Sequence, residues 1–430
     1  MSEAANTSRI SSAIFVMLIA IAAISTVVYG AVDTGTWAII NPAIGTVAIL
    51  WLGNSFRSGT LVIPDNLLQL PMLALIAIGL LQLLPLAQVR SLDPYNTRLF
   101  LIRLVCFLLY FAACLVFIDT KRRISIIAIG TIIFGAVMAF AGTLQRLASP
   151  EAIYGLREPN QAIPFGPFVN QHHFAALMEM TGAMAAAFLL TNTLHKQKKL
   201  LVAIAAVIMA LACVLTSSRG GLACFVVGIV MVGFLSRMTA KGDSPEERNS
   251  RTMLLAGLGF AAAVVAMVVF VGGDQSLLRG VGLGQPTSDL TNGRLHFWGI
   301  AIKIFTANPI LGAGFDAYGV AFTQFDTWNG TFRVENAHNE YLQFLAEGGL
   351  VGITAVLAFV AIFVRQGLSN IRATTDPFLK ACAIGSFGGC VAILLHSVVD
   401  FPLRTPSNAF VFLILVTVAT MTSKLSTHND

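Results

Sequence analysis

A short polar stretch, residues 335–342, concentrates groups able to do acid–base chemistry in an otherwise apolar chain. It reads Glu-Asn-Ala-His-Asn-Glu-Tyr-Leu. Asn336 is a good helix N-cap, which would put His338 in the first helical turn. The positive end of a helix disfavours the imidazolium, so the ring should stay neutral and able to accept a proton. The neighbours expected to orient or support it are Glu335, Glu340, Asn339 and Tyr341.

Two arginines stand in patterns that suit an anion. Arg219 follows Ser217 and Ser218, which can cap a helix, and precedes a pair of glycines that let a ligand approach the backbone. A helix start beside a guanidinium is a phosphate site. The alternative without a functional role is an arginine that anchors a membrane span at the lipid surface. Arg294 is expected in the first turn of a helix capped at 291 or 292 and running to about 306, where the helix dipole disfavours a cation unless an anion is near.

Other polar groups gather before and within apolar runs. Glu179 falls inside a predicted membrane span, where an ionisable residue is costly and marks a functional site by default. His396 and Asp400, four residues apart, are expected to pair with each other or, with Arg404 nearby, only to fix local structure. Asn170, His172 and His173 lead into the span of Glu179, and Asn170 and His173 are assigned supporting roles in a substrate groove or in helix packing.

Some kinds of site are absent from the sequence. It contains no Asp-x-Asp pair, P-loop, G-x-S-x-G or H-E-x-x-H motif, so no metal and no cofactor are predicted. The six cysteines lie in apolar runs without metal-ligand spacing, which is typical of small core residues.

The elements that must position these groups are membrane helices. The chain is 56% apolar and only 11% charged, whereas a soluble domain is about 25% charged. The prediction is an all-α polytopic membrane protein, a single domain over 1–430 with about twelve spans and a large outer loop at 273–345 that carries the catalytic motifs. The predicted spans are 12–31, 36–52, 68–87, 99–117, 124–145, 172–192, 200–216, 220–236, 252–272, 347–365, 378–397 and 406–422.

Charge sets the expected orientation. Every second loop, together with the two ends of the chain, holds 16 of the 27 Lys and Arg residues. The positive-inside rule puts those loops and both termini in the cytoplasm. The polar stretch and both arginine motifs then lie on the outer, periplasmic side, and the net charge of +6 reflects topology rather than a nucleic-acid partner.

At this point the motifs resemble the bacterial O-antigen ligase and Wzy-type O-antigen polymerase family of membrane glycosyltransferases, which have a GT-C-like architecture. The resemblance extends from about 165 to 405, and its most specific block runs from Arg294 to Gly349. The matching segments are 168–174, 218–220, 293–298, 308–315, 337–342, 348–349 and the pair His396 and Asp400.

The resemblance implies a reaction and its partners. The donor would be a glycan on undecaprenyl pyrophosphate, with Arg219 and Arg294 on the pyrophosphate and His338 as the base for the acceptor hydroxyl. The acceptor would be another lipid-linked glycan (a polymerase) or lipid A-core (a ligase), and the anomeric centre would be inverted without metal or nucleotide. The enzyme would sit in the bacterial inner membrane among lipids, with partners in the polysaccharide export machinery.

The competing interpretation is a transporter that flips a lipid-linked glycan. Twelve spans suit it, but a transporter should place its polar groups near the bilayer midplane in broken helices. In this sequence only Glu179 and Arg103 lie well within spans, and the remaining candidates cluster outside them. Glycan transfer is therefore favoured, with a slight preference for polymerisation that no residue supports.

Overall fold

The computed structural model describes residues 9–85, 91–159, 162–191, 193–239, 293–328 and 334–426. Within these ranges the protein is helical and has no strands. The helices are α1 (Arg9–Val27), α2 (Thr34–Ser58), α3 (Gln69–Gln82), α4 (Pro94–Phe117), α5 (Lys121–Ala148), α6 (Gln171–Leu190), α7 (Lys196–Leu215), α8 (Arg219–Met238), α10 (Arg294–Ala307), α11 (Tyr318–Phe322), α12 (Glu340–Ala373), α13 (Pro377–His396) and α14 (Pro406–Ser426), with 3-10 turns η1 (Tyr29–Ala31) and η3 (Pro402–Arg404).

Ten of the described helices are long and apolar enough to cross a membrane, and they coincide with ten of the twelve predicted spans. The all-α, multi-pass prediction is therefore confirmed. The predicted span 68–87 is too long, because α3 has only 14 residues and rises about 21 Å, short of the ~30 Å hydrocarbon core. The predicted span 252–272 lies outside the described residues.

Helices α6, α13 and α14 form the centre of the bundle and are the most buried of the spans. Glycines on α13 bring it close to α6: a Cβ at Gly385 would lie 2.9 Å from the Cα of Met184, and one at Gly389 would lie 2.9 Å from the Cα of Met180. In lipid the hydrophobic effect does not drive helices together, so their association depends on close packing, which small residues permit. This packing holds the ends of both helices in place, and the candidate site lies at those ends.

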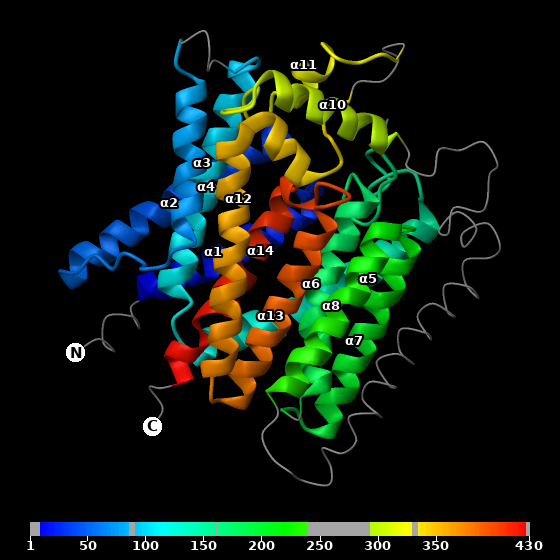
Figure 1. Ribbon diagram of the computed structural model, residues 1–430. Coiled ribbons are helices and arrows are strands. Elements are labelled where there is room, and N and C mark those ends of the chain that lie inside the picture. The colour runs from blue at the N-terminus through cyan, green and yellow to red at the C-terminus, as the bar shows by residue number, and fades with distance from the viewer. Residues whose placement is uncertain are drawn as a thin grey trace.

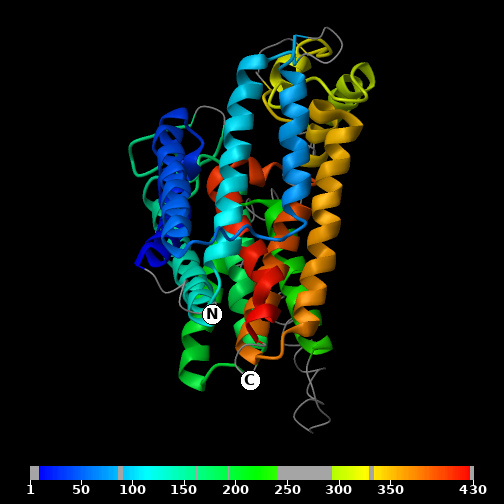
Figure 2. The same ribbon diagram turned by 90° about the vertical axis from the view of Figure 1, so that its left-hand side faces the viewer.

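The chain alternates in direction, so alternate helix ends gather on one side. Figures 1 and 2 show α10 and α11 lying across one end of the bundle, above the start of α12. The starts of α6, α8, α12 and α14 and the end of α13 meet there. The opposite end carries the basic residues that begin α7 and end α12, which agrees with the predicted sorting of charge between the two sides.

Helix α12 is kinked at Gly349, whose φ of 61° and ψ of −161° are accessible only to glycine. The kink makes room for the segment 309–312, because Pro309 and Ile310 accept backbone hydrogen bonds from Leu350 and Val351. A Cβ on Gly349 would lie 2.3 Å from the carbonyl oxygen of Ile310. The kink therefore ties the segment after α10 to the start of α12.

Replacing Gly349 with alanine should destabilise the fold by at least about 2 kcal/mol, because it adds backbone strain and a direct clash. Gly352→Ala is the matched control, since a Cβ there meets atoms only at 3.6 Å or more. Thermal unfolding in detergent measures both. Equal unfolding temperatures for the two variants would contradict the role assigned to the kink.

Candidate active site

Asp400, just beyond the end of α13, is the centre of the polar groups at this end of the bundle. Its side chain is only 1% exposed. Oδ2 lies 3.1 Å from Nη2 of Arg294, and Oδ1 lies 3.4 Å from Nδ1 of His338. The same Oδ1 accepts the backbone N–H of Phe401 at 2.9 Å. One buried carboxylate thus joins the starts of α10 and α12 to the end of α13.

Asp400 is a carboxylate at neutral pH. Burial alone would raise the pKa of its carboxyl, but the contact with His338 and the charges of the surrounding histidines outweigh burial and hold the pKa well below its usual range. Because the folded pKa is depressed, the stability that this carboxylate contributes is fully present above the unfolded pKa of about 3.9. That stability is lost only as the pH falls from there through the folded value.

His338 precedes α12 and is not in its first turn, so the predicted cap was wrong. Asn339 is the N-cap, and its side chain accepts the N–H of Leu342 at 3.0 Å. A tertiary contact fixes the first residue of α12, because the N–H of Glu340 donates to the carbonyl of Ser397 at 2.8 Å. His338 has a left-handed backbone, with φ of 50°.

The ring of His338 is held by Asp400 and by two phenylalanines. Phe401 meets it edge-on at a centroid distance of 4.8 Å, and Phe297 stacks at 6.0 Å. A carboxylate beside Nδ1 favours the tautomer with its proton on that nitrogen, which leaves the lone pair on Nε2. The side chain is 30% exposed, so it is accessible to a substrate. Asp400, and not Glu335 or Glu340, is the carboxylate that contacts His338.

Arg219 is the first residue of α8 and is exposed. The predicted serine cap is confirmed, because Ser218 Oγ accepts the N–H of Gly221 at 3.1 Å. His172 Nδ1 lies 2.8 Å from the same oxygen, which connects the start of α6 to the start of α8. The arrangement presents a guanidinium at the positive end of a helix, at the same end of the bundle as His338.

Arg294 begins α10, and Gly293 is its N-cap, with φ of 78° and no side-chain capping bond. The predicted caps at 291 and 292 lie outside the described residues. A cation in a first turn needs an anion nearby, and Asp400 is that anion. The side chain of Arg294 is 23% exposed, so the ion pair lies at the edge of the site rather than sealed beneath it.

Glu179 and His396 form a buried pair, with 2.7 Å between Oε1 and Nδ1 and side chains at most 1% exposed. The predicted pairing of His396 with Asp400 was therefore wrong: His396 ends α13, and Asp400 lies past the helix, where four-residue spacing no longer puts side chains on one face. A carboxyl group inside a span needs such a partner. The pair joins α6 to α13 immediately beside Gly220, whose Cβ would lie 3.4 Å from His396 Nε2.

Several predicted supporting residues hold the backbone of the site. Asn170 caps α6 by accepting the N–H of His172 at 2.8 Å. Tyr341 donates its hydroxyl to the carbonyl of Leu394 at 2.9 Å. His173 Nδ1 lies 2.6 Å from the hydroxyl of Thr405.

The two predicted glutamates lie apart from the Asp400 carboxylate. Glu340 accepts the backbone N–H groups of Leu403 and Arg404, both at 3.1 Å. Glu335 packs on Gly319, with Oε2 2.7 Å from the position of a Cβ there. Each fixes a loop, and neither contacts the imidazole of His338 in the way that sequence reasoning expected.

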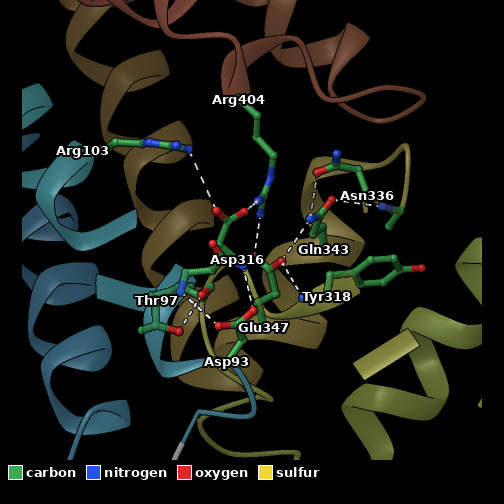
Figure 3. A network of polar contacts seen from close by, with 12 residues as sticks. Asp93, Thr97, Arg103, Asp316, Tyr318, Asn336, Gln343, Glu347 and Arg404 are labelled. Atoms are coloured by element: carbon green, nitrogen blue, oxygen red, sulfur yellow. Dashed lines mark hydrogen bonds and ion pairs between the residues drawn. The ribbon is translucent and has the colours of Figure 1, made fainter. Parts of the chain in front are cut away.

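A second buried network, shown in Figure 3, was missed by the sequence analysis. Arg404 pairs through Nη2 with Glu347 Oε2 at 2.6 Å and through Nη1 with Asp316 Oδ1 at 3.1 Å. Gln343 donates to Glu347 Oε1 at 3.0 Å, and Arg103 lies 3.9 Å from Asp316. A signal was available, because Glu347 opens a predicted span, where an ionisable residue requires a partner. The network fixes η3, and with it the loop that carries Asp400.

No group of three or more His, Cys, Asp and Glu side chains within the described ranges could hold a metal ion. The candidate site instead has two arginines, a histidine and a carboxylate. The carboxylate of Asp400 contacts Arg294 and His338. Such a site can bind an anion and accept a proton.

Comparison with known proteins identifies relatives of part of the chain. Residues 204–373 match the family model described as O-antigen ligase, Wzy_C. The chain is also similar to the exopolysaccharide production protein ExoQ of Rhizobium meliloti (strain 1021), at 25% identity over 181 residues. That alignment covers 40% of this chain and 40% of the relative, so the chain spans well under half of the curated relative's length. Both matches confirm the resemblance indicated by the motifs.

Asp400→Asn should destabilise the protein by about 3–5 kcal/mol, because it leaves Arg294 near a neutral amide in a buried place. Asp33→Asn is the control: that carboxylate also pairs with an arginine, Arg157, but is 40% exposed, and breaking exposed pairs costs about 0–1 kcal/mol. Thermal unfolding at neutral pH compares the two. If both variants unfold at the same temperature, Asp400 does not hold the three segments together.

Proposed function

We propose that this chain, whose residues 204–373 match the O-antigen ligase family model, transfers a glycan from a polyprenyl pyrophosphate to an acceptor hydroxyl. The donor lipid is undecaprenyl pyrophosphate. One observation carries the proposal: Arg219, Arg294 and His338 come from three separate helix starts to the same end of the bundle, and Asp400 links two of them.

The two arginines bind the pyrophosphate of the donor. Arg219 adds a guanidinium to the N–H groups at the start of α8, and Arg294 does the same at the start of α10. Both positions favour negative charge through the helix dipole. In the reaction the bond from the anomeric carbon to the phosphate oxygen breaks, and its electron pair leaves with the pyrophosphate. Preorganised cations stabilise this developing charge.

His338 is the base. The acceptor oxygen attacks the anomeric carbon from the side opposite the leaving group, so the configuration inverts. As the new C–O bond forms, the hydroxyl proton passes to Nε2 of His338. Asp400 is a positioning residue: it faces Nδ1 and stabilises the imidazolium that forms. The products are the extended glycan and undecaprenyl pyrophosphate, and neither metal nor nucleotide takes part.

The location follows from charge and chemistry. We place the site on the periplasmic face of the inner membrane, with both termini in the cytoplasm, since the basic loops favour that orientation. Lipid-linked donors need no nucleotide on that face. The acceptor is a second lipid-linked glycan or lipid A-core, and the similarity to a protein named for exopolysaccharide production favours polymerisation. Partners in polysaccharide export would receive the product.

Reconstitution in liposomes tests the function. Wild-type protein supplied with an undecaprenyl-pyrophosphate-linked glycan and an acceptor should release one undecaprenyl pyrophosphate for each glycosidic bond formed. Transbilayer movement of the donor with no product from either acceptor would overturn the enzyme proposal in favour of a flippase. In cells, deletion should leave lipid A with a single repeat if the protein is a polymerase, and with no polymer if it is a ligase.

The site residues have distinct expected effects in the same assay. Arg219→Ala and Arg294→Ala should each lower the rate about 100-fold or more, as the loss of one transition-state contact does. The lysine variants should recover little of it where contact is bidentate. Arg146→Ala is the control, since Arg146 lies in the last turn of α5 and, among the contacts described, bonds only a nearby loop carbonyl. Full activity of both lysine variants would reduce the contact to simple charge attraction.

His338→Ala should abolish turnover while the protein still binds the donor, because the base acts on the acceptor. Donor binding is measured with undecaprenyl pyrophosphate in detergent. Glycosidic product that persists at the wild-type rate in this variant would rule out His338 as the base.

A further inference from the structure

An aromatic platform lies beside the candidate site. The imidazole of His296 and the indole of Trp328 stack in parallel, with centroids 4.2 Å apart and planes inclined by 5°. Phe297 meets the indole at 5.8 Å, edge-on. The indole is nonetheless 47% exposed. A large aromatic side chain that is stacked on one face and still about half exposed is available to a ligand.

The platform is held rigidly. Asp326 Oδ1 lies 2.9 Å from His296 Nε2 and accepts the backbone N–H of Trp328 at 3.0 Å. One carboxylate thus fixes both stacked rings. Gly293 leaves room for the indole, because a Cβ there would lie 2.9 Å from Cη2 of Trp328. An exposed aromatic ring that is fixed from two sides loses little entropy when it binds a flat, rigid partner.

The platform is one ring away from the base. Phe297 lies 5.8 Å from Trp328 and 6.0 Å from His338, so a single ring contacts both. A molecule lying on the indole would therefore be within two ring spacings of the imidazole that takes the acceptor proton. Arg294, assigned above to the donor pyrophosphate, begins the same helix that carries His296 and Phe297.

We propose that Trp328, backed by His296, binds a pyranose ring of the acceptor saccharide by stacking. One face of a pyranose presents mostly C–H groups, and the face of an aromatic ring carries the negative part of its quadrupole. The sugar hydroxyls at the ring edge stay free for water or polar side chains. The inference rests on the proposed glycan transfer and adds to it a subsite that sets which sugar hydroxyl reaches His338.

The alternative role for an exposed tryptophan in such a protein is an anchor at the membrane interface. An anchor needs only an amphipathic ring at the right depth. It requires neither a parallel imidazole behind the indole nor a carboxylate that fixes both. The experiment must therefore measure saccharide binding itself.

Binding and turnover are measured on the full-length protein with Trp328→Ala and Trp328→Phe. The probe is the repeat-unit oligosaccharide released by mild acid from the host's own polysaccharide, titrated without donor and followed by saturation-transfer NMR. Trp328→Ala should weaken binding about threefold to tenfold, the range expected for one stacking contact. Trp328→Phe, which keeps an aromatic face, should stay within about twofold of wild type. In turnover, the alanine variant should raise the acceptor KM more than it lowers kcat.

Tyr95→Ala is the matched control, an exposed aromatic (65%) in the first turn of α4 outside the site. Equal weakening by Tyr95→Ala and Trp328→Ala, or wild-type affinity in Trp328→Ala, would overturn the platform; so would a wild-type protein that does not bind the oligosaccharide. If the wild-type protein makes no glycosidic product but Trp328→Ala still loses oligosaccharide binding, the subsite stands and the enzyme proposal is wrong. If His338→Ala loses product but Trp328→Ala leaves the acceptor KM unchanged, the enzyme proposal stands and the subsite is wrong.

Discussion

A single buried carboxylate organises the polar end of this membrane protein. Asp400 is almost inaccessible to solvent, and a charge in such a place must be paired and hydrogen-bonded or it costs several kcal/mol (~3–5). It contacts Arg294 at the start of α10 and His338 just before α12, and it lies itself in the loop that follows α13. The requirement to compensate one charge therefore brings three separate parts of the chain together. The same contacts give the histidine its orientation and keep a cation at the edge of the site.

The bundle supports this arrangement by two other means. Close contact of α13 with α6 through Gly385 and Gly389 fixes the helix end from which the Asp400 loop leaves. The pair of Arg404 with Glu347 fixes the other side of that loop. Spanning helices that are apolar elsewhere tolerate these charges because each has a partner. The charged groups of the candidate site are thus concentrated at the end of the bundle, where we propose that lipid-linked substrates bind.

Sequence reasoning found the class of protein, since long apolar runs are a strong local signal, and it named most of the polar residues that gather at this end of the bundle. It was wrong about features that tertiary contacts determine, namely the start of α12 and the partner of His396. Asn336 and Asn339 are equally good caps, and a backbone bond from Glu340 to Ser397 selects the second. The spacing of His396 and Asp400 implied a helical pair, but the helix ends between them. Trp328 has no local signal, because the imidazole stacked on it belongs to His296 in α10, far away in the sequence.

The binding of the donor pyrophosphate by the two arginines is tested most directly by a cryo-EM structure of the protein in lipid nanodiscs with undecaprenyl pyrophosphate. We expect density for the pyrophosphate between the guanidinium groups of Arg219 and Arg294, on the side of Asp400 that faces His338. Pyrophosphate bound elsewhere, for example against Arg103 and Arg404, or at the opposite end of the bundle, would contradict it.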